Sequence, residues 1–194
     1  MRAIRIIHDE HRSIAAVLHG MLYLVRQIRD DRAKPNFELF RAMIYYIDAF
    51  PERFHHPKED NYLFRVLRIR QPDAAPLLDR LQNEHWMGAH KIRTLERALM
   101  RYQLGGATQF APFAAAAEAY ASFHWEHMRA EEDVVLPMAQ KYLTPADWQA
   151  VDTAFLEHAD PLRGTTDAKD EYEALFSRIV NLAPPPIGVG PEAR

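Results

Sequence analysis

The chain contains no cysteine, and this absence excludes several classes of chemistry at once. Disulfides, thiol nucleophiles, iron–sulfur clusters and thiolate zinc sites all need cysteine sulfur. Any metal bound by this chain must therefore use nitrogen and oxygen ligands. Glycine is also scarce, with 7 residues among 194, which indicates few tight turns.

Two further absences concern partners and location. The 24 Lys+Arg residues do not exceed the 27 Asp+Glu residues, so the chain lacks the basic excess that neutralises a nucleic-acid backbone. No apolar run reaches the length of about 18 residues that a membrane-spanning helix needs. Charges also interrupt the opening MRAIRIIHDEHR before it reaches the length of a signal peptide. We therefore expect a cytoplasmic protein with no nucleic-acid partner and no membrane partner.

Apolar residues recur at the helical period along most of the chain, which predicts an all-α protein. Long helices are expected up to about residue 29, from 36 to 70, from 74 to 105 and from 108 to 141. Pro51 and Pro57 predict a kink or local break around residues 47 to 57, because each proline removes a helical hydrogen bond. The short links between the helices predict an up-down four-helix bundle.

The remainder of the chain predicts a smaller extension. Two short helices are expected over about 144–157 and 167–181, followed by a Pro-rich tail that is extended along the surface or disordered. We therefore divide the chain into a bundle over residues 1–142 and an extension over residues 143–194 that packs on the same domain.

Histidine is abundant, with 10 residues, and several lie where the helical pattern calls for an inward apolar side chain. His11 and His85 take such positions on the first and third predicted helices. The second and fourth helices each carry a histidine followed four residues later by a glutamate, a spacing that puts both side chains on one helix face. The predicted inner faces of these two helices also include Tyr62 and Val134. The candidate metal ligands are His11, His55, Glu59, His85, His127 and Glu131.

A single inward histidine is more often a hydrogen-bonded core residue than a ligand. Six such donors in one small bundle are different, because each buried carboxylate must be paired, hydrogen-bonded or bound to metal. Four imidazoles and two carboxylates suit two borderline divalent ions a few ångströms apart. Iron is the leading candidate, and manganese and zinc are alternatives.

Four short segments carry a resemblance to a known family. They are HDEHR at residues 8–12, HHPKED at 55–60, NEH at 83–85 and HMRAEE at 127–132. In this order, one per helix, they resemble the hemerythrin-like family, also called HHE cation-binding domains, over residues 1 to 142. The resemblance implies a four-helix bundle with a carboxylate-bridged di-iron centre that binds or reacts with dioxygen, peroxide or nitric oxide. It also implies that the four histidines among the candidates are terminal ligands and that both glutamates bridge.

The sequence departs from the oxygen-carrying hemerythrins at two positions. Those proteins place two histidines four residues apart on the third helix, whereas this chain has Ala89 there and His90 one residue later. The fifth histidine ligand is missing or comes from His90 or His124. The carriers also use an acid five residues after the last-helix histidine, which is Glu132 here, although helical geometry favours Glu131. This altered set of metal ligands argues against reversible oxygen carriage and favours chemistry in which the protein reacts with or senses oxygen species.

Other assignments remain open at this point. His56 turns about 100° from its neighbouring ligand, so we expect a structural or surface role for it. A ferritin-like carboxylate oxidase would need two Glu-x-x-His pairs, and only Glu52-x-x-His55 has that spacing. A helical interaction module without metal, with merely hydrogen-bonded histidines, is the third reading. The sequence permits both enzymatic turnover and homo-oligomer formation.

Overall fold

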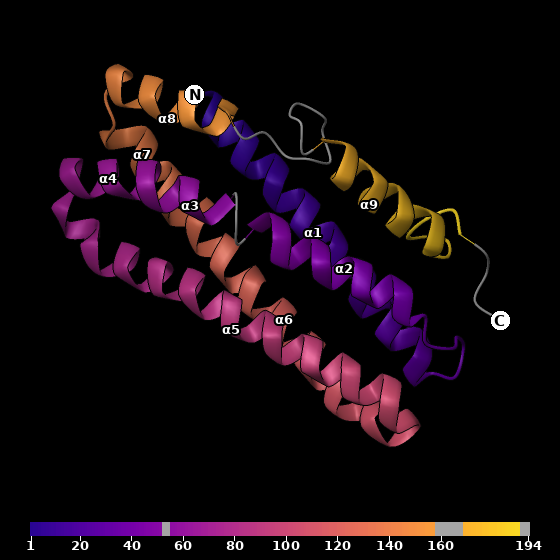
Figure 1. Ribbon diagram of the computed structural model, residues 1–194. Helices are drawn as coiled ribbons and strands as arrows, with labels where there is room; N and C mark the ends of the chain where they lie inside the picture. The colour runs from indigo at the N-terminus through magenta and orange to yellow at the C-terminus, as the bar shows by residue number, and fades with distance from the viewer. Residues whose placement is uncertain (52–54, 158–168, 191–194) are drawn as a thin grey trace.

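The computed structural model describes residues 1–51, 55–157 and 169–190, and these residues form helices and no strand (Figure 1). The predicted all-α class is therefore confirmed. The three longest described helices are α1 (Arg2–Arg29), α5 (Ala75–Gly105) and α6 (Phe110–Ala130), and the shorter α2 (Phe37–Phe50) packs with them in one bundle. Helix α1 packs against α2 and α6, and α5 packs against the same two helices.

Two of the predicted long helices are each divided into shorter segments. In the first, α2 ends at Phe50 and α3 begins at His56; both bounds lie inside the range where proline predicts a break, and residues 52–54 lie outside the described part. It continues as α3 (His56–Lys58), the π-helical segment η2 (Glu59–Phe64) and α4 (Arg65–Arg70). In the second, α6 leads into the π-helical segment η5 (Glu131–Val135) and then α7 (Leu136–Tyr142). Both π segments thus begin at a candidate glutamate.

The π segments correct part of the predicted inner face. The sequence pattern placed Tyr62 and Val134 inward, but their side chains are 39% and 42% exposed. Leu63 and Val135 are buried instead. A π turn spans i→i+5 hydrogen bonds, so it takes up one residue more than an α turn. The buried face after each glutamate is therefore shifted by one residue from the regular helical prediction.

The apolar core is divided into two clusters, and the candidate ligands lie between them. On α1, Ile7 belongs to one cluster and Ile14 to the other, with His11 between. On α5, Leu81 and Ile92 flank His85 in the same way. A polar layer therefore crosses the interior at one level, closed above and below by packed apolar side chains.

The extension adds α8 (Pro145–Glu157) and α9 (Lys169–Leu182), which agree with the two predicted short helices except at residues 167 and 168, outside the described part. Thr144 and Asp147 exchange hydrogen bonds at the start of α8, as a capping box does. Helix α8 packs along α1, and Asp152 accepts a hydrogen bond of 2.7 Å from the backbone N–H of Ala3. The extension thereby satisfies a backbone donor in the first turn of α1.

The tail differs from the prediction of an extended or disordered segment. The backbone N–H of Gly190 donates to the carbonyl of Ala183 at 2.8 Å, so residues 183–190 fold back on the end of α9. Ile187 packs against the larger apolar cluster beside Gly20. Apolar burial against α1 therefore outweighs the preference of this proline-rich sequence for an extended chain.

Candidate metal centre

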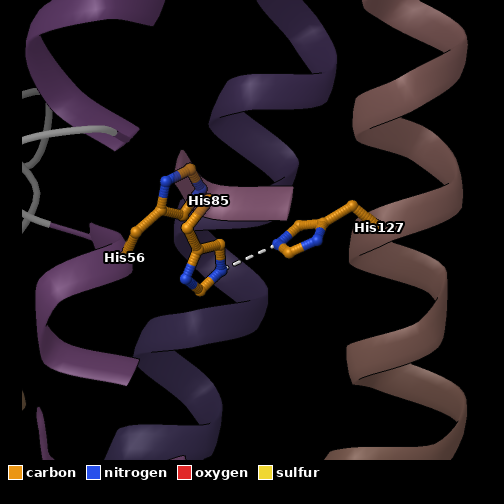
Figure 2. Close-up of side chains that lie close together, drawn as sticks. All are labelled: His56, His85 and His127. Carbon is orange, nitrogen blue, oxygen red and sulfur yellow. Dashed lines mark hydrogen bonds between the residues drawn. The ribbon is translucent and has the colours of Figure 1, made fainter. Parts of the chain in front are cut away.

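Four histidines converge in the polar layer, each from a different helical segment. His11 on α1, His55 just before α3, His85 on α5 and His127 on α6 are all buried. The Nε2 atoms of His11 and His55 are 3.0 Å apart, and those of His85 and His127 are also 3.0 Å apart (Figure 2 shows the second pair). The four imidazoles therefore form two pairs whose Nε2 atoms point at each other.

Glu59 lies between these two histidine pairs. Its Oε1 atom is 3.4 Å from Nε2 of His55, and its Oε2 atom is 3.6 Å from Nε2 of His85. Each oxygen thus faces a different pair, which is the arrangement of a carboxylate that spans two positions.

Glu131 spans the pairs from the other helix. Its Oε2 atom is 3.3 Å from Nε2 of His11, and its Oε1 atom is 3.3 Å from Nε2 of His127. Glu132 lies outside this layer and contacts the far nitrogen of His11. The structure therefore places Glu131, the residue that helical geometry favours, at the spanning position.

The two carboxylates lack ordinary compensation for their burial. None of the four oxygens of Glu59 and Glu131 accepts a hydrogen bond of ordinary geometry, and both side chains are essentially inaccessible to solvent. A buried carboxylate in this state is costly unless a cation lies close to it. Two overlapping donor groups have all their atoms within 4.8 Å of one another: His11, His55, Glu59 and Glu131, and then Glu59, His85, His127 and Glu131. Each group suits a borderline divalent ion.

The outer nitrogen of every paired histidine binds a carboxylate. The Nδ1 contacts are His11 with Glu132 at 2.8 Å, His55 with Glu10 at 2.6 Å, His85 with Asp60 at 2.9 Å and His127 with Glu84 at 2.9 Å. A carboxylate acceptor holds the proton on Nδ1, so Nε2 presents a lone pair to the interior. Two such lone pairs 3.0 Å apart repel each other unless a proton or a metal ion lies between them.

Comparison with known proteins agrees with this arrangement. The family model of the hemerythrin HHE cation-binding domain matches residues 2–139. The chain belongs to this family. No curated protein and no solved structure matched it. The family resemblance seen in the sequence is thus confirmed, and the matched residues of this hemerythrin-family chain end before α8. Among the helices that the structure describes, none is long and apolar enough to cross a membrane.

Three of the four outer carboxylates were not considered from the sequence, and the fourth, Glu132, was considered only as an alternative bridge. Each is the immediate neighbour of a candidate ligand, yet it serves a histidine on another helical segment. Glu10 precedes His11 and binds His55, for example, because consecutive side chains diverge by about 100° around a helix. An acid directly beside a candidate ligand, repeated four times, is the sequence signal that could have identified them.

Two residues considered for the missing fifth histidine lie outside the converging set. His90 is exposed, and its ring centroid is 4.5 Å from that of Trp86. His124 is buried and packs on Tyr120, but its nitrogens belong to neither spanning donor group. In this hemerythrin-family chain, neither histidine takes the position of the fifth ligand.

Of the structural and surface roles expected for His56, the structure agrees with the structural one. Its ring is buried and lies parallel to His85, with centroids 4.1 Å apart and an interplanar angle of 7° (Figure 2). Nitrogens of His56, His85 and His127 lie within 4.8 Å of one another. An imidazole binds a metal in its own ring plane, so two parallel stacked rings do not direct lone pairs at one ion. His56 therefore orients His85, and the surface alternative was wrong.

Electrostatics in the layer follow from the spanning glutamates. Burial lowers the pKa of His11, but contacts with Glu131 and Glu132 outweigh it and raise that pKa to about 9. Burial also lowers the pKa of His127, but the charge of Glu131 and the contact with it outweigh burial and raise that pKa to about 10. Burial and the charge of Glu131 together hold the pKa of Glu59 well above its ordinary value. Without metal, bound protons therefore supply positive charge that the layer needs.

These pKa values predict how the stability of the metal-free protein depends on pH. His11 and His127 have folded-state pKa values above the ordinary 6.5, so their stabilising protons are fully bound below pH 6.5. That contribution is lost as the pH rises through about 9 to 10. The melting temperature of chelator-treated protein is therefore expected to fall between pH 7 and pH 10. A His11→Gln variant should show a weaker fall, and an equally steep one would contradict the assignment.

Proposed function

We propose that this protein is a di-metal protein of the hemerythrin type that binds, senses or reacts with dioxygen, peroxide or nitric oxide. Residues 1–142 form an up-down four-helix bundle around two ions, and residues 143–194 pack on it as a helical extension with a Pro-rich tail. The ions are iron in the host cell, with manganese and zinc as alternatives. The cytoplasmic location and the absence of a nucleic-acid partner stay predictions from the sequence.

One observation carries the proposal. In each of two histidine pairs the Nε2 atoms face each other at 3.0 Å, and two buried carboxylates without hydrogen bonds span both pairs. This donor set has the charge and the nitrogen and oxygen content that two divalent cations need. A metal-free interaction module would have only bound protons to balance these two buried carboxylates, so it fits the geometry less well.

The ligand assignment follows from the pairs. His11 and His55 would hold one ion and His85 and His127 the other, while Glu59 and Glu131 would bridge them. Two iron ions would supply electrons and open coordination positions for a small diatomic or peroxide ligand. The ferritin-like alternative depends on Glu52-x-x-His55, and Glu52 lies outside the described residues.

The protein's own side chains then have defined tasks in this chemistry. The four outer carboxylates fix the imidazole tautomers and ring orientations, which keeps every Nε2 lone pair directed inward. The apolar clusters on both sides of the layer exclude bulk water, so charges inside the layer interact more strongly than in solvent.

The direct test is the metal content of protein purified from iron-grown cells. We expect two ions per chain in the parent and at most one in His85→Ala, because one ion loses a terminal ligand. His90→Ala is the matched control, five residues along the same helix and exposed, and it should retain both ions. Electronic spectra before and after oxygen exposure would distinguish an oxo-bridged iron pair from zinc.

Two results would contradict the proposal or one of its ligands. A parent protein that holds no metal after iron-replete growth would favour the interaction module. Equal metal content in His85→Ala and the parent would remove His85 from the ligand set.

A further inference from the structure

Lys58 is a buried lysine that lies directly behind one of the paired histidines. Its Nζ atom donates to Oε1 of Glu10 at 2.8 Å, and the other oxygen of Glu10 accepts from Nδ1 of His55 at 2.6 Å. All three side chains are buried. An ammonium group, a carboxylate and an imidazole thus form a continuous chain that ends at the proposed metal position of His11 and His55.

The outer partners of the other three histidines have a different environment. The side chains of Glu132, Asp60 and Glu84 are 37%, 28% and 18% exposed. Water can therefore solvate these carboxylates and screen their charges, whereas Glu10 has no solvent exposure. Among the four outer carboxylates, Glu10 depends most on a protein cation.

The extension closes this buried chain from outside. The Nζ atom of Lys58 lies 4.9 Å from the ring centroid of Phe155 on α8, a cation–π contact. Phe155 is fully buried, and α8 also packs against η2, the segment that begins at Glu59. Helix α8 lies beyond residues 2–139, which match the family. This side of the centre is therefore built partly from residues outside the matched domain.

The charge of Lys58 has a direct consequence for His55. Without it, one oxygen of the buried Glu10 would lose the donor that holds it, and the carboxylate could turn toward another donor or draw in water. A Glu10 carboxylate that has turned no longer holds Nδ1 of His55 in its present direction. The Nε2 lone pair would then lose its fixed direction toward the ion.

We propose that Lys58 is a positioning residue that neutralises Glu10 and makes the metal position of His11 and His55 the tighter and more slowly exchanging of the two. The proposal assumes the di-metal function above. It predicts different metal affinities and exchange rates for two metal positions that each have two histidines and the same two glutamates.

The test is zinc binding to metal-free protein, measured by competition with a chromophoric chelator. The parent is expected to bind two ions, and Lys58→Met to bind one of them about 10- to 100-fold more weakly, the range for loss of an outer partner. The second ion should be unaffected and should leave the parent faster in an exchange experiment. Lys141→Met is the matched control, because Lys141 also lies 4.9 Å from an aromatic ring but on α7.

A double variant separates the charge of Lys58 from its packing. In Glu10→Gln the carboxylate charge is absent, and an amide oxygen remains to accept from His55. Adding Lys58→Met to Glu10→Gln removes an ammonium group that has already lost its carboxylate, so it should not weaken zinc binding further. This comparison also serves if Lys58→Met alone fails to fold, since the double variant leaves no uncompensated charge.

Three results would overturn the proposal. They are parent-like zinc binding by Lys58→Met, equal weakening of both ions, and the same loss in the Glu10→Gln background as in the parent. A parent that binds fewer than two ions would overturn the di-metal function together with this inference. A parent that binds two ions alongside an unaffected Lys58→Met would overturn the inference alone.

Discussion

Replacing Glu131 by alanine is expected to leave iron-grown protein with at most one ion per chain, or with two ions that have lost their magnetic coupling. The oxygens of Glu131 face Nε2 of both His11 and His127 at 3.3 Å, so one substitution removes a ligand from both proposed ions. The substitution also removes buried negative charge that would balance the cations. Metal analysis and magnetic susceptibility of the same sample measure both effects.

Glu132→Ala is the matched control for that experiment. Glu132 contacts the outer nitrogen of His11 and is partly exposed, so its loss weakens the orientation of one ligand without removing a donor. We expect this variant to retain two coupled ions at saturating iron. A damaged Glu132→Ala beside an intact Glu131→Ala would show that the last helix uses the five-residue spacing of the oxygen carriers.

Phe113→Ala is expected to produce the largest loss of stability, about 3–5 kcal/mol, as for other buried phenylalanines. Phe113 is fully buried in the larger cluster, and its ring centroid lies 5.0 Å from Phe40 and 5.7 Å from Tyr102. For a chain of this length, such a loss lowers the melting temperature by roughly 6–20 °C. Thermal unfolding of metal-loaded protein, followed by circular dichroism, would measure it.

Leu104→Ala is the control for the core substitution, because Leu104 is strongly exposed and its truncation should cost less than about 0.5 kcal/mol. Phe113→Ala should still bind two ions at low temperature, since the ring packs in an apolar cluster beside the polar layer. A melting temperature within 2 °C of the parent would contradict the assigned role of Phe113.

The inward direction of the candidate ligands could be predicted from the sequence for a specific physical reason. A histidine and a glutamate four residues apart share a helix face whatever surrounds them, so the inward direction of Glu59 and Glu131 can be read locally. His11 and His85 interrupt apolar stripes, which is also a local signal. The structure places all of these side chains in one layer.

The features that were missed depend on packing between helices. Glu10 binds a histidine 45 residues away, and that contact exists only because α1 lies beside the segment that carries His55. The stacking of His56 on His85 likewise joins two segments, and it overrides the outward direction that an ideal helix gives His56. Single-helix geometry contains no information about either contact.

The two π segments give this bundle some tolerance to changes in chain length. Each takes up one residue beyond regular helical geometry, directly after a glutamate of the polar layer. Deletion of the exposed Tyr62 or Val134 would convert its segment into an ordinary α turn. Phe64 and Leu136 would then keep their core positions, because the helix beyond would be neither rotated nor displaced. Each of these helices can thus lose one residue while the elements that follow it stay in register.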